Sequence, residues 1–513
     1  MEEFDLDTPL IEFRDKFGRG SIYWTLRDAS QGICIFGGIG SGKTSASGRA
    51  IALNYLAHQY GGIVLTVKPD EKDLWLDYCQ LTGRLNDLII IEPEGRYFFN
   101  FMDFISSNEG QGGVIITENL VQILKTVIQA SEEKSGGRGD DAFWETAGDL
   151  LLFNVVDLLK LAYGKVSIQD MYDVVVTSPK PEDNLSGDNS ELEKTAFMKA
   201  FKLARDKVNA QVANWKKGFT KEAFDLMIKN GTFEARLLEA LPDARLLKYV
   251  DQFFVETYRE LSERTRSIIQ FSFSGFLFRL LREPVYSLFC KSKSTVTPLD
   301  CMDGKIVLIN LPIKKYHKVG RDCQIMFKYI AQRAFEKRDI AQNDRPVFIW
   351  QDESANFIHA ADVDTQTTAR SSRILTVCLT QNLPNFYANM GGDRAKYRVS
   401  SFMGTLGTKV FHANADIETN RYASDLFGQM DMEETSSSTT LGSNFSSTEG
   451  TTKRLKQIVR PEGFVSLRCG GPENNFKAEA FVHLQGKRFA CGLSFDLVNF
   501  SQLYSLNNKN ETS

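Results

Sequence analysis

The residues with the clearest chemistry lie near the start of the chain, where eight consecutive residues read GGIGSGKT. They fit the pattern G-x-x-x-x-G-K-[ST], whose glycines let the backbone curl so that successive N–H groups face a chain of phosphates. The helix expected to begin there adds the positive end of its dipole. We expect Lys43 to reach the β- and γ-phosphate oxygens and the Thr44 hydroxyl to ligate Mg²⁺. The alternative is a chance glycine loop. The nucleotide-binding set is Gly37, Gly38, Ile39, Gly40, Ser41, Gly42, Lys43 and Thr44.

A pair of carboxylates supplies the other half of an ATP-hydrolysing site. Residues 347–353 read VFIWQDE, an apolar run that ends in two acidic residues. We expect Asp352 to hold Mg²⁺ through its water shell and Glu353 to act as general base toward the attacking water. Gln351 is polar where an apolar residue is more usual. A rival pair, Asp70 and Glu71, follows GIVLTVKP, and we interpret it as the start of a helix, where acidic residues are favoured.

A third polar group ends the segment RSSRILTVCLTQ at residues 370–381. Gln381 closes a predicted strand, where its amide could contact the γ-phosphate or the water, or only make turn contacts. Arg370 and Arg373 precede the same strand. Either could be an arginine finger that acts across a subunit interface, because such fingers stabilise transition-state charge. A solvated basic pair is the ordinary alternative.

Short apolar runs that alternate with helical patterns must position these groups. Helices are expected from about 43 to 58 and from about 71 to 81. Continuous runs of β-branched residues suit strands that are covered on both faces, and strands separated by helices indicate a largely parallel sheet. The fold class is therefore α/β. The expected strands are 32–36, 62–67, 88–91, 305–310, 347–350, 374–379 and 409–412.

The middle of the chain has a different pattern. Apolar residues recur there at spacings of three and four, which indicates helices. We therefore divide the chain into a nucleotide-binding part at 1–112, an all-α insertion at 113–290 and the rest of the nucleotide-binding part at 291–513. Residues 431–452 are rich in Ser, Thr and Gly and are interpreted as a flexible loop. The helices expected in the insertion are 141–163, 190–208, 231–245 and 251–281.

Composition limits the choice of partners and compartment. The 513 residues are 42% apolar and 25% charged, with a formal charge of −4, so any DNA contact must come from a local basic patch. The eight cysteines form no C-x-x-C pair, which favours reduced thiols over a zinc site. No signal peptide or membrane span is found, and a cytoplasmic protein is expected. Two basic patches are candidates for contact with DNA: residues 215–221 (WKKGFTK), and Lys314, Lys315, His317, Lys318 and Arg321.

The ordered set of these segments resembles the coupling-protein family of type IV secretion, the TraD/TraG group, and more distantly the FtsK/HerA translocases. IFGGIGSGKT matches the family's nucleotide loop, IVLTVKPDEK its second strand and DAFWETAGDLLL a family helix. RPVFIWQDESANF resembles its carboxylate segment and RILTVCLTQNLPNFYANMGG its glutamine strand. ADIETNRYASDLFGQ resembles a helix that precedes the Ser-rich segment.

The resemblance implies a RecA-like P-loop core with an inserted all-α domain, ATP and Mg²⁺ as cofactors, and a homo-hexamer with sites between subunits. It also implies a relaxase-bound DNA strand or effector proteins as cargo, and a secretion channel as partner. Family members usually carry an N-terminal transmembrane pair that is not seen here, so we expect a separate membrane-anchoring protein at the inner face of the membrane. Arg373 stands where translocases tend to have Gly.

Three functions are compatible with the sequence. The first is a DNA-translocating coupling ATPase of a conjugative or type IV secretion-like system. The second is an ATPase that delivers protein substrates. The third is an ATP-gated cargo-receptor platform without turnover, which the pair of Asp352 and Glu353 disfavours because a pure binder has little need of a base.

Overall fold

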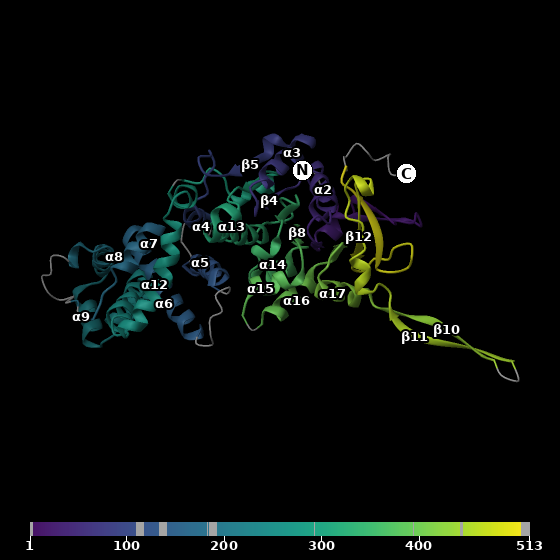
Figure 1. Cartoon of the computed structure of the whole chain (residues 1–513). Helices are drawn as coiled ribbons and strands as arrows, with labels where there is room; N and C mark the ends of the chain where they lie inside the picture. Colours follow the sequence, from purple (N-terminus) through teal and green to yellow (C-terminus); the bar gives the residue numbers. More distant parts are fainter. Residues whose placement is uncertain are drawn as a thin grey trace. The chain divides into compact units, whose positions relative to one another are not determined.

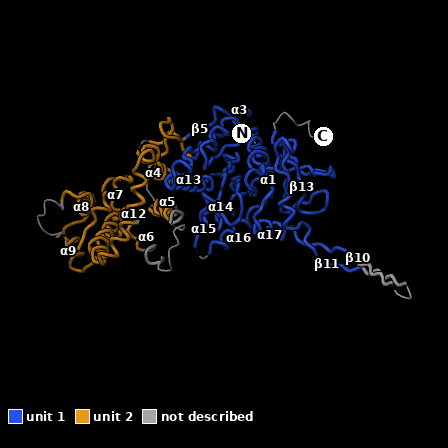
Figure 2. Tube along the Cα trace, viewed as in Figure 1, with its two compact units in different colours: residues 1–90, 298–513 blue, residues 91–297 orange. Residues whose placement is uncertain are grey.

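The computed structural model describes residues 4–108, 117–132, 141–181, 183, 192–291, 293–392, 394–441 and 445–503. The chain forms two compact units, one of residues 1–90 and 298–513 and one of residues 91–297 (Figure 2). The second unit is therefore longer at both ends than the insertion expected at 113–290. The added residues belong to this unit because its first and last segments pair with each other. Phe99 N–H donates to Leu288 O at 2.9 Å, and Thr295 N–H donates to Phe98 O at 2.8 Å.

A nine-stranded sheet organises the described part of the first unit (Figure 1). The strands from β9 to β6 run parallel to one another, while β12 is antiparallel to β9 and β13 to β12. The α/β class expected from the sequence is confirmed. In spatial order the strands are β13 (Phe495–Ser501), β12 (Lys477–Leu484), β9 (Thr408–His412), β3 (Ile33–Phe36), β8 (Ile374–Thr380), β7 (Val347–Gln351), β4 (Gly61–Leu65), β6 (Ile306–Ile309) and β5 (Leu88–Ile91).

Both faces of this sheet are covered, as the apolar runs predict. Ile33 and Ile35 of β3 join one hydrophobic cluster, whereas Cys34 and Phe36 join another. Because successive side chains of a strand point to opposite faces, the two clusters lie on the two sides of the sheet. The helices of the unit are α1 (Leu26–Ala29), α2 (Arg49–Ala57), α3 (Glu71–Leu81), α13 (Ile313–Glu336), α14 (Ala361–Thr368), α15 (Leu383–Met390), α16 (Ala395–Thr405) and α17 (Ile417–Phe427). A separate hairpin of β1 (Pro9–Arg14) and β2 (Ser21–Thr25) precedes them.

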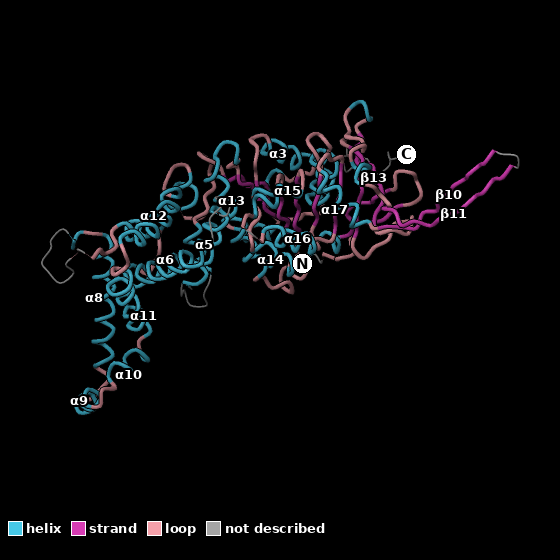
Figure 3. Tube along the Cα trace, turned by 60° about the horizontal axis from the view of Figure 1, so that its bottom comes forward, coloured by secondary structure: helices cyan, strands magenta, loops and turns pink. Residues whose placement is uncertain are grey.

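Helices make up most of the described part of the second unit (Figure 3). One helix expected at 231–245 is divided in two, because Pro242 cannot continue α10 and instead begins α11 at its first turn. The helices are α4 (Phe101–Asn108), α5 (Thr117–Glu132), α6 (Asp141–Tyr163), α7 (Ile168–Val176), α8 (Ala196–Lys216), α9 (Lys221–Lys229), α10 (Phe233–Ala240), α11 (Pro242–Asp251) and α12 (Glu263–Leu280). No helix among the described residues of the chain is both long enough and apolar enough to span a membrane.

The Ser-rich segment is not the loop that its composition indicates. It forms a two-stranded antiparallel hairpin, β10 (Gln429–Leu441) and β11 (Phe445–Gln457), which projects from the first unit (Figures 1 and 3). The pairing runs from Gln429 opposite Gln457 to Leu441 opposite Phe445. Threonine is a good strand former, but the sequence of this segment has no alternation of apolar and polar residues that would reveal a strand.

Candidate nucleotide site

The glycine loop leaves the end of β3 and leads into α2 through a π-helical turn at Lys43–Gly48. Gly40 and Gly42 have φ angles of 74° and 92°, which residues with a Cβ rarely adopt. A Cβ on Gly42 would lie 2.6 Å from Cβ of Ala478. The pattern therefore needs its glycines here for backbone curvature and for close packing.

The loop is tied to the two strands that flank β3. Gly37 N–H donates to Thr380 O at 3.1 Å, and Gly38 N–H donates to Ala413 O at 2.8 Å. These acceptors follow or end β8 and β9, so the loop rests on the carboxyl edge of the sheet. In open α/β sheets this edge is where ligands bind.

A buried histidine supports the start of the nucleotide helix, and sequence reasoning missed it. His412 Nε2 lies 2.7 Å from Ser47 Oγ, and its Nδ1 lies 3.1 Å from Glu479 O. Burial lowers the pKa of His412 to about 3, so the ring is neutral. Nδ1 must then carry the proton for the carbonyl, and Nε2 accepts from the Ser47 hydroxyl. The only signal in the sequence is its place at the end of a predicted strand.

Thr44 and Asp352 meet beside the loop. The Thr44 hydroxyl donates to Asp352 Oδ2 at 3.1 Å, and the aspartate is 4% exposed. Burial raises the pKa of Asp352, while Lys43 and Lys68 oppose that shift. A hydroxyl and a buried carboxylate are oxygen ligands suited to Mg²⁺, and Ser41 Oγ lies buried in the same loop without a described hydrogen-bond partner. These residues fit a bound nucleotide with Mg²⁺.

Glu353 contacts two other residues that were predicted from the sequence, Lys43 and Gln381. Its Oε1 lies 3.7 Å from Lys43 Nζ and accepts a hydrogen bond from Gln381 Nε2 at 3.1 Å. Gln381 in turn has its carbonyl oxygen held by Asn414 Nδ2 at 2.8 Å. Asn414 follows β9 and was not foreseen. The arrangement places a carboxylate, an ammonium and an amide together at the carboxyl ends of β3, β7 and β8.

The rival carboxylate Glu71 also lies beside this site. It stands in the first turn of α3, as expected, yet it is 6% exposed and lines a small cavity together with Thr44 and Asp352. Its Oε2 accepts from Val67 N–H at 2.8 Å, and its Oε1 is buried without a described partner. Burial, with a smaller contribution from Asp352, raises the pKa of Glu71 to about 8. Asp70 is exposed.

The two arginine-finger candidates lie at the opposite end of β8 from Gln381. Seven strand residues separate them from that edge, roughly 20 Å at 3.3 Å per residue. Arg373 donates to Phe4 O and lies 3.7 Å from Asp344 Oδ2, so it is part of the fold. Arg370 is exposed. Neither reaches the glycine loop of its own chain.

The two basic patches differ in structure. In the helical unit, Trp215 packs on Phe219 with ring centroids 4.7 Å apart, and Lys216 Nζ lies 5.2 Å from the centre of the Phe233 ring. These aromatic rings form a small packed cluster among α8, α9 and α10. At the start of α13, by contrast, Lys314, Lys315, His317 and Lys318 are exposed, and only Arg321 is buried, beside Asp322.

The parallel sheet, with the glycine loop at its carboxyl edge, defines a RecA-like P-loop fold. Comparisons with known proteins narrow this class. Residues 346–468 match the family model described as the TraM recognition site of TraD and TraG. That segment contains β7, β8 and the hairpin of β10 and β11. No curated protein matches the sequence.

Solved structures of the bacterial conjugative coupling protein TrwB share the fold. An unbound form superposes with a TM-score of 0.61 at 14% identity over 95% of this chain and 88% of that one. TrwB in complex with ADP and Mg²⁺ superposes with a TM-score of 0.57 at 15% identity, over 94% of this chain and 88% of that one. TrwB with a non-hydrolysable GTP analogue gives 0.56 at 15% identity over 93% and 88%. The match of residues 346–468 to the family model confirms the resemblance to TraD and TraG, and the TrwB structures show a shared fold.

Proposed function

We propose that this chain is an ATP-hydrolysing DNA translocase, a coupling ATPase of a conjugative or type IV secretion-like system. The observation that carries the proposal is the convergence of Lys43 and Thr44 with Asp352, Glu353 and Gln381 at one edge of the sheet. A site that only binds nucleotide needs the loop and Mg²⁺. A half-buried carboxylate, Glu353, that faces the loop lysine and an amide is the arrangement expected for activating a water.

Each residue has a distinct role in the proposed reaction. Backbone N–H groups of residues 37–44 cradle the phosphates, and Lys43 neutralises the β- and γ-phosphate oxygens. Thr44 and Asp352 would hold Mg²⁺, which would supply charge stabilisation to the phosphoryl oxygens. Glu353 takes a proton from the attacking water. Gln381 orients the Glu353 carboxylate through its 3.1 Å hydrogen bond and reports the state of the site to β8.

The exposed basic turn at the start of α13 is the proposed DNA contact. Lys314 N–H donates to Val67 O at 3.0 Å, which attaches the turn to the end of β4, on the same sheet edge as the nucleotide site. His317 has a φ of 51° and a ψ of −134° there, a conformation that is costly for a residue with a Cβ. Lysines on a turn suit contacts to the phosphate backbone, which dominates DNA affinity. The packed cluster around Trp215 is less suited, because its rings already contact one another.

The assembly and the partners belong to the same proposal. Arg370 lies too far from the nucleotide site of its own chain to act there. If it is the arginine finger, it must therefore act on a neighbouring subunit, and a homo-hexamer would bring it to that subunit's site. A relaxase or effector protein would be cargo, and a secretion-channel or membrane-anchoring protein would hold the ATPase at the inner face of the cell membrane. The match of residues 346–468 to a protein-recognition segment supports contact with such a partner.

An ATPase assay tests the function. Phosphate release is measured with single-stranded DNA, with duplex DNA and without DNA, and Lys43→Ala serves as the inactive control. DNA-stimulated turnover is expected. Turnover that no DNA changes, but that a partner protein stimulates, would favour the protein-delivering alternative. Tight nucleotide binding without turnover would favour the receptor platform.

A further inference from the structure

A stripe of polar side chains is buried along one side of α13. Gln324, Lys328 and Gln332 stand four residues apart, so they share one face of the helix. Their exposed fractions are 0%, 0% and 4%, respectively. Burying an ammonium is costly unless it is paired and hydrogen-bonded, so the contacts of Lys328 need an explanation.

Lys328 joins the two ends of the turn that carries the catalytic carboxylates. Its Nζ donates to Phe357 O at 2.8 Å, beyond the turn, and lies 3.4 Å from Gln351 Oε1, directly before Asp352. The same ammonium donates to Asp362 Oδ2 at 2.8 Å. The polar Gln351, unusual at the end of an apolar strand, is thus a partner of a buried cation.

Asp362 completes the network from α14. Its Oδ1 accepts from Gln332 Nε2 at 2.8 Å, and its Oδ2 accepts from His359 N–H at 2.9 Å. Burial lowers the pKa of His359 to about 3, so that ring is neutral. Lys328 is therefore the cation that balances Asp362, and the pair ties α13, α14 and residues 351–359 together.

The turn between these contacts has a constrained backbone. Glu353 has φ and ψ of 50° and 48°, the left-handed region that residues with a Cβ rarely occupy. The Asn356 side chain donates to Glu353 O, and the Ser354 hydroxyl donates to Leu379 O, each at 3.0 Å. Such a conformation persists only where surrounding contacts impose it. Lys328 provides contacts on both sides of it.

We propose that Lys328 is a positioning residue for ATP hydrolysis. Paired with Asp362, it holds residues 351–357 so that the Glu353 carboxylate faces Lys43 and Gln381. The proposal rests on the role proposed above for Glu353. Lys328 touches neither nucleotide nor water; it acts through the turn.

The test removes both charges together. Lys328→Met alone would leave Asp362 buried and unpaired, which destabilises proteins strongly, whereas replacing a buried pair by apolar residues is often tolerated. In the double variant Lys328→Met/Asp362→Leu, the full chain is expected to bind a fluorescent ATP analogue with unchanged Kd. Its kcat is expected to fall roughly 10- to 100-fold, because a displacement of about 1 Å at a reacting group has an effect of that order.

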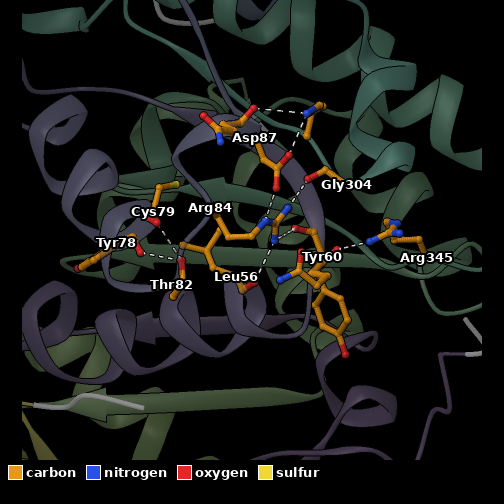
Figure 4. Close-up of polar contacts among 12 residues, drawn as sticks. Leu56, Tyr60, Tyr78, Cys79, Thr82, Arg84, Asp87, Gly304 and Arg345 are labelled. Atoms are coloured by element: carbon orange, nitrogen blue, oxygen red, sulfur yellow. Dashed lines mark hydrogen bonds and ion pairs between the residues drawn. The ribbon is translucent and has the colours of Figure 1, made fainter. Parts of the chain in front are cut away.

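A matched control is the buried pair of Arg84 and Asp87, whose polar contacts are drawn in Figure 4. Arg84 is 3% exposed, donates to Asp87 Oδ2 at 2.6 Å and to Leu56 O at 2.9 Å, and also donates to Gly304 O. Tyr60 and Gly304, next to this group, precede β4 and β6, so Arg84 lies far from the carboxyl ends of the strands. Arg84→Met/Asp87→Leu is expected to lower Tm while kcat of the folded protein stays at the wild-type value.

The outcomes distinguish the positioning role of Lys328 from the general-base role of Glu353. A folded Lys328→Met/Asp362→Leu protein with wild-type kcat overturns the positioning role, as does a change in KM alone. Should the double variant not fold, Lys328→Gln/Asp362→Asn removes both charges and the reach of the ammonium to Phe357 O while it keeps polar side chains, and an unchanged kcat in that variant overturns the role equally. Glu353→Gln is measured in parallel. If it hydrolyses ATP at the wild-type rate, the proposed general base is wrong, whatever Lys328 does.

Discussion

The Thr44 hydroxyl and the Asp352 carboxylate form a hydrogen bond of 3.1 Å although 308 positions separate them in the chain. Thr44 follows β3 and Asp352 follows β7, and β8 lies between these two strands in the sheet. The contact joins the phosphate-binding loop to the acid that holds Mg²⁺ in the proposed site. It also brings Lys43 to Glu353. Binding and hydrolysis of ATP both depend on this junction in the proposed mechanism.

Lys43→Ala is expected to abolish ATP hydrolysis and to weaken nucleotide binding at least tenfold. The ammonium supplies charge-assisted contacts to the phosphates, which are the stronger class of hydrogen bond. Phosphate release and titration with a fluorescent ATP analogue measure the two effects. Arg14→Ala removes an exposed cation paired with Glu12 and should change neither. An equal loss of hydrolysis and of nucleotide binding in both variants would contradict a specific role for Lys43.

Glu353→Gln is expected to separate binding from turnover. The amide keeps the shape of the side chain but cannot take a proton, and positioned general bases contribute about 10²- to 10⁴-fold to rate. Single-turnover hydrolysis should slow by that order, while the Kd for ATP stays within about twofold of wild type, since Lys43, Thr44 and Asp352 remain. A variant that hydrolyses ATP normally would remove Glu353 from the mechanism.

Gly42→Ala is expected to lower both stability and nucleotide affinity. Its φ of 92° is strained for alanine, and the new Cβ would lie 2.6 Å from Cβ of Ala478. The expected loss is about 2–4 kcal/mol, the sum of backbone strain and overpacking. Gly83→Ala is the control, with a φ of 71° but nothing within 4 Å of its Cβ. Urea titration of both variants should show a larger loss for Gly42→Ala.

Glu71 is expected to make the protein less stable as pH rises. Burial raises its pKa from 4.5 to about 8, so between those values the folded state keeps a proton that the unfolded chain has lost. The slope of stability against pH is then negative, by at most about 1.4 kcal/mol per pH unit for this group. Glu71→Gln keeps an acceptor for Val67 N–H and should remove that slope. Thermal unfolding without nucleotide from pH 5 to 8 measures it, and parallel curves for the two proteins would refute the assignment.

Arg370 is expected to act across a subunit interface. Arg370→Ala should keep Tm and nucleotide binding but lose hydrolysis, because fingers contribute about 10³- to 10⁵-fold to turnover. Arg373→Ala should lower Tm instead, since Arg373 contacts Phe4 O and Asp344 within its own chain. Mixing Arg370→Ala with Lys43→Ala subunits should restore hydrolysis at mixed interfaces. Absence of any recovery in a mixed ring would contradict action between subunits.

Several features of this protein could be predicted from the sequence because they depend on neighbouring residues. The glycine loop is a short pattern with its own backbone requirement, and buried strands such as Ile33–Phe36 are continuous apolar runs. Helices of the insertion repeat apolar residues at helical spacing. The same logic failed at residues 429–457, which form a hairpin although their sequence has no apolar period. Its composition indicated a loop instead.

The tertiary structure alone decided which distant residues meet. Strand order β3-β8-β7 brings Thr44 to Asp352 and Gln381 to Glu353, and that order depends on how the helices pack on both faces of the sheet. Lys328 looks like a surface lysine in sequence, because only the fold shows that α13 turns it toward Asp362. A local pattern specifies the backbone that its own residues need. The partner of a buried charge is chosen by the packing of the whole chain.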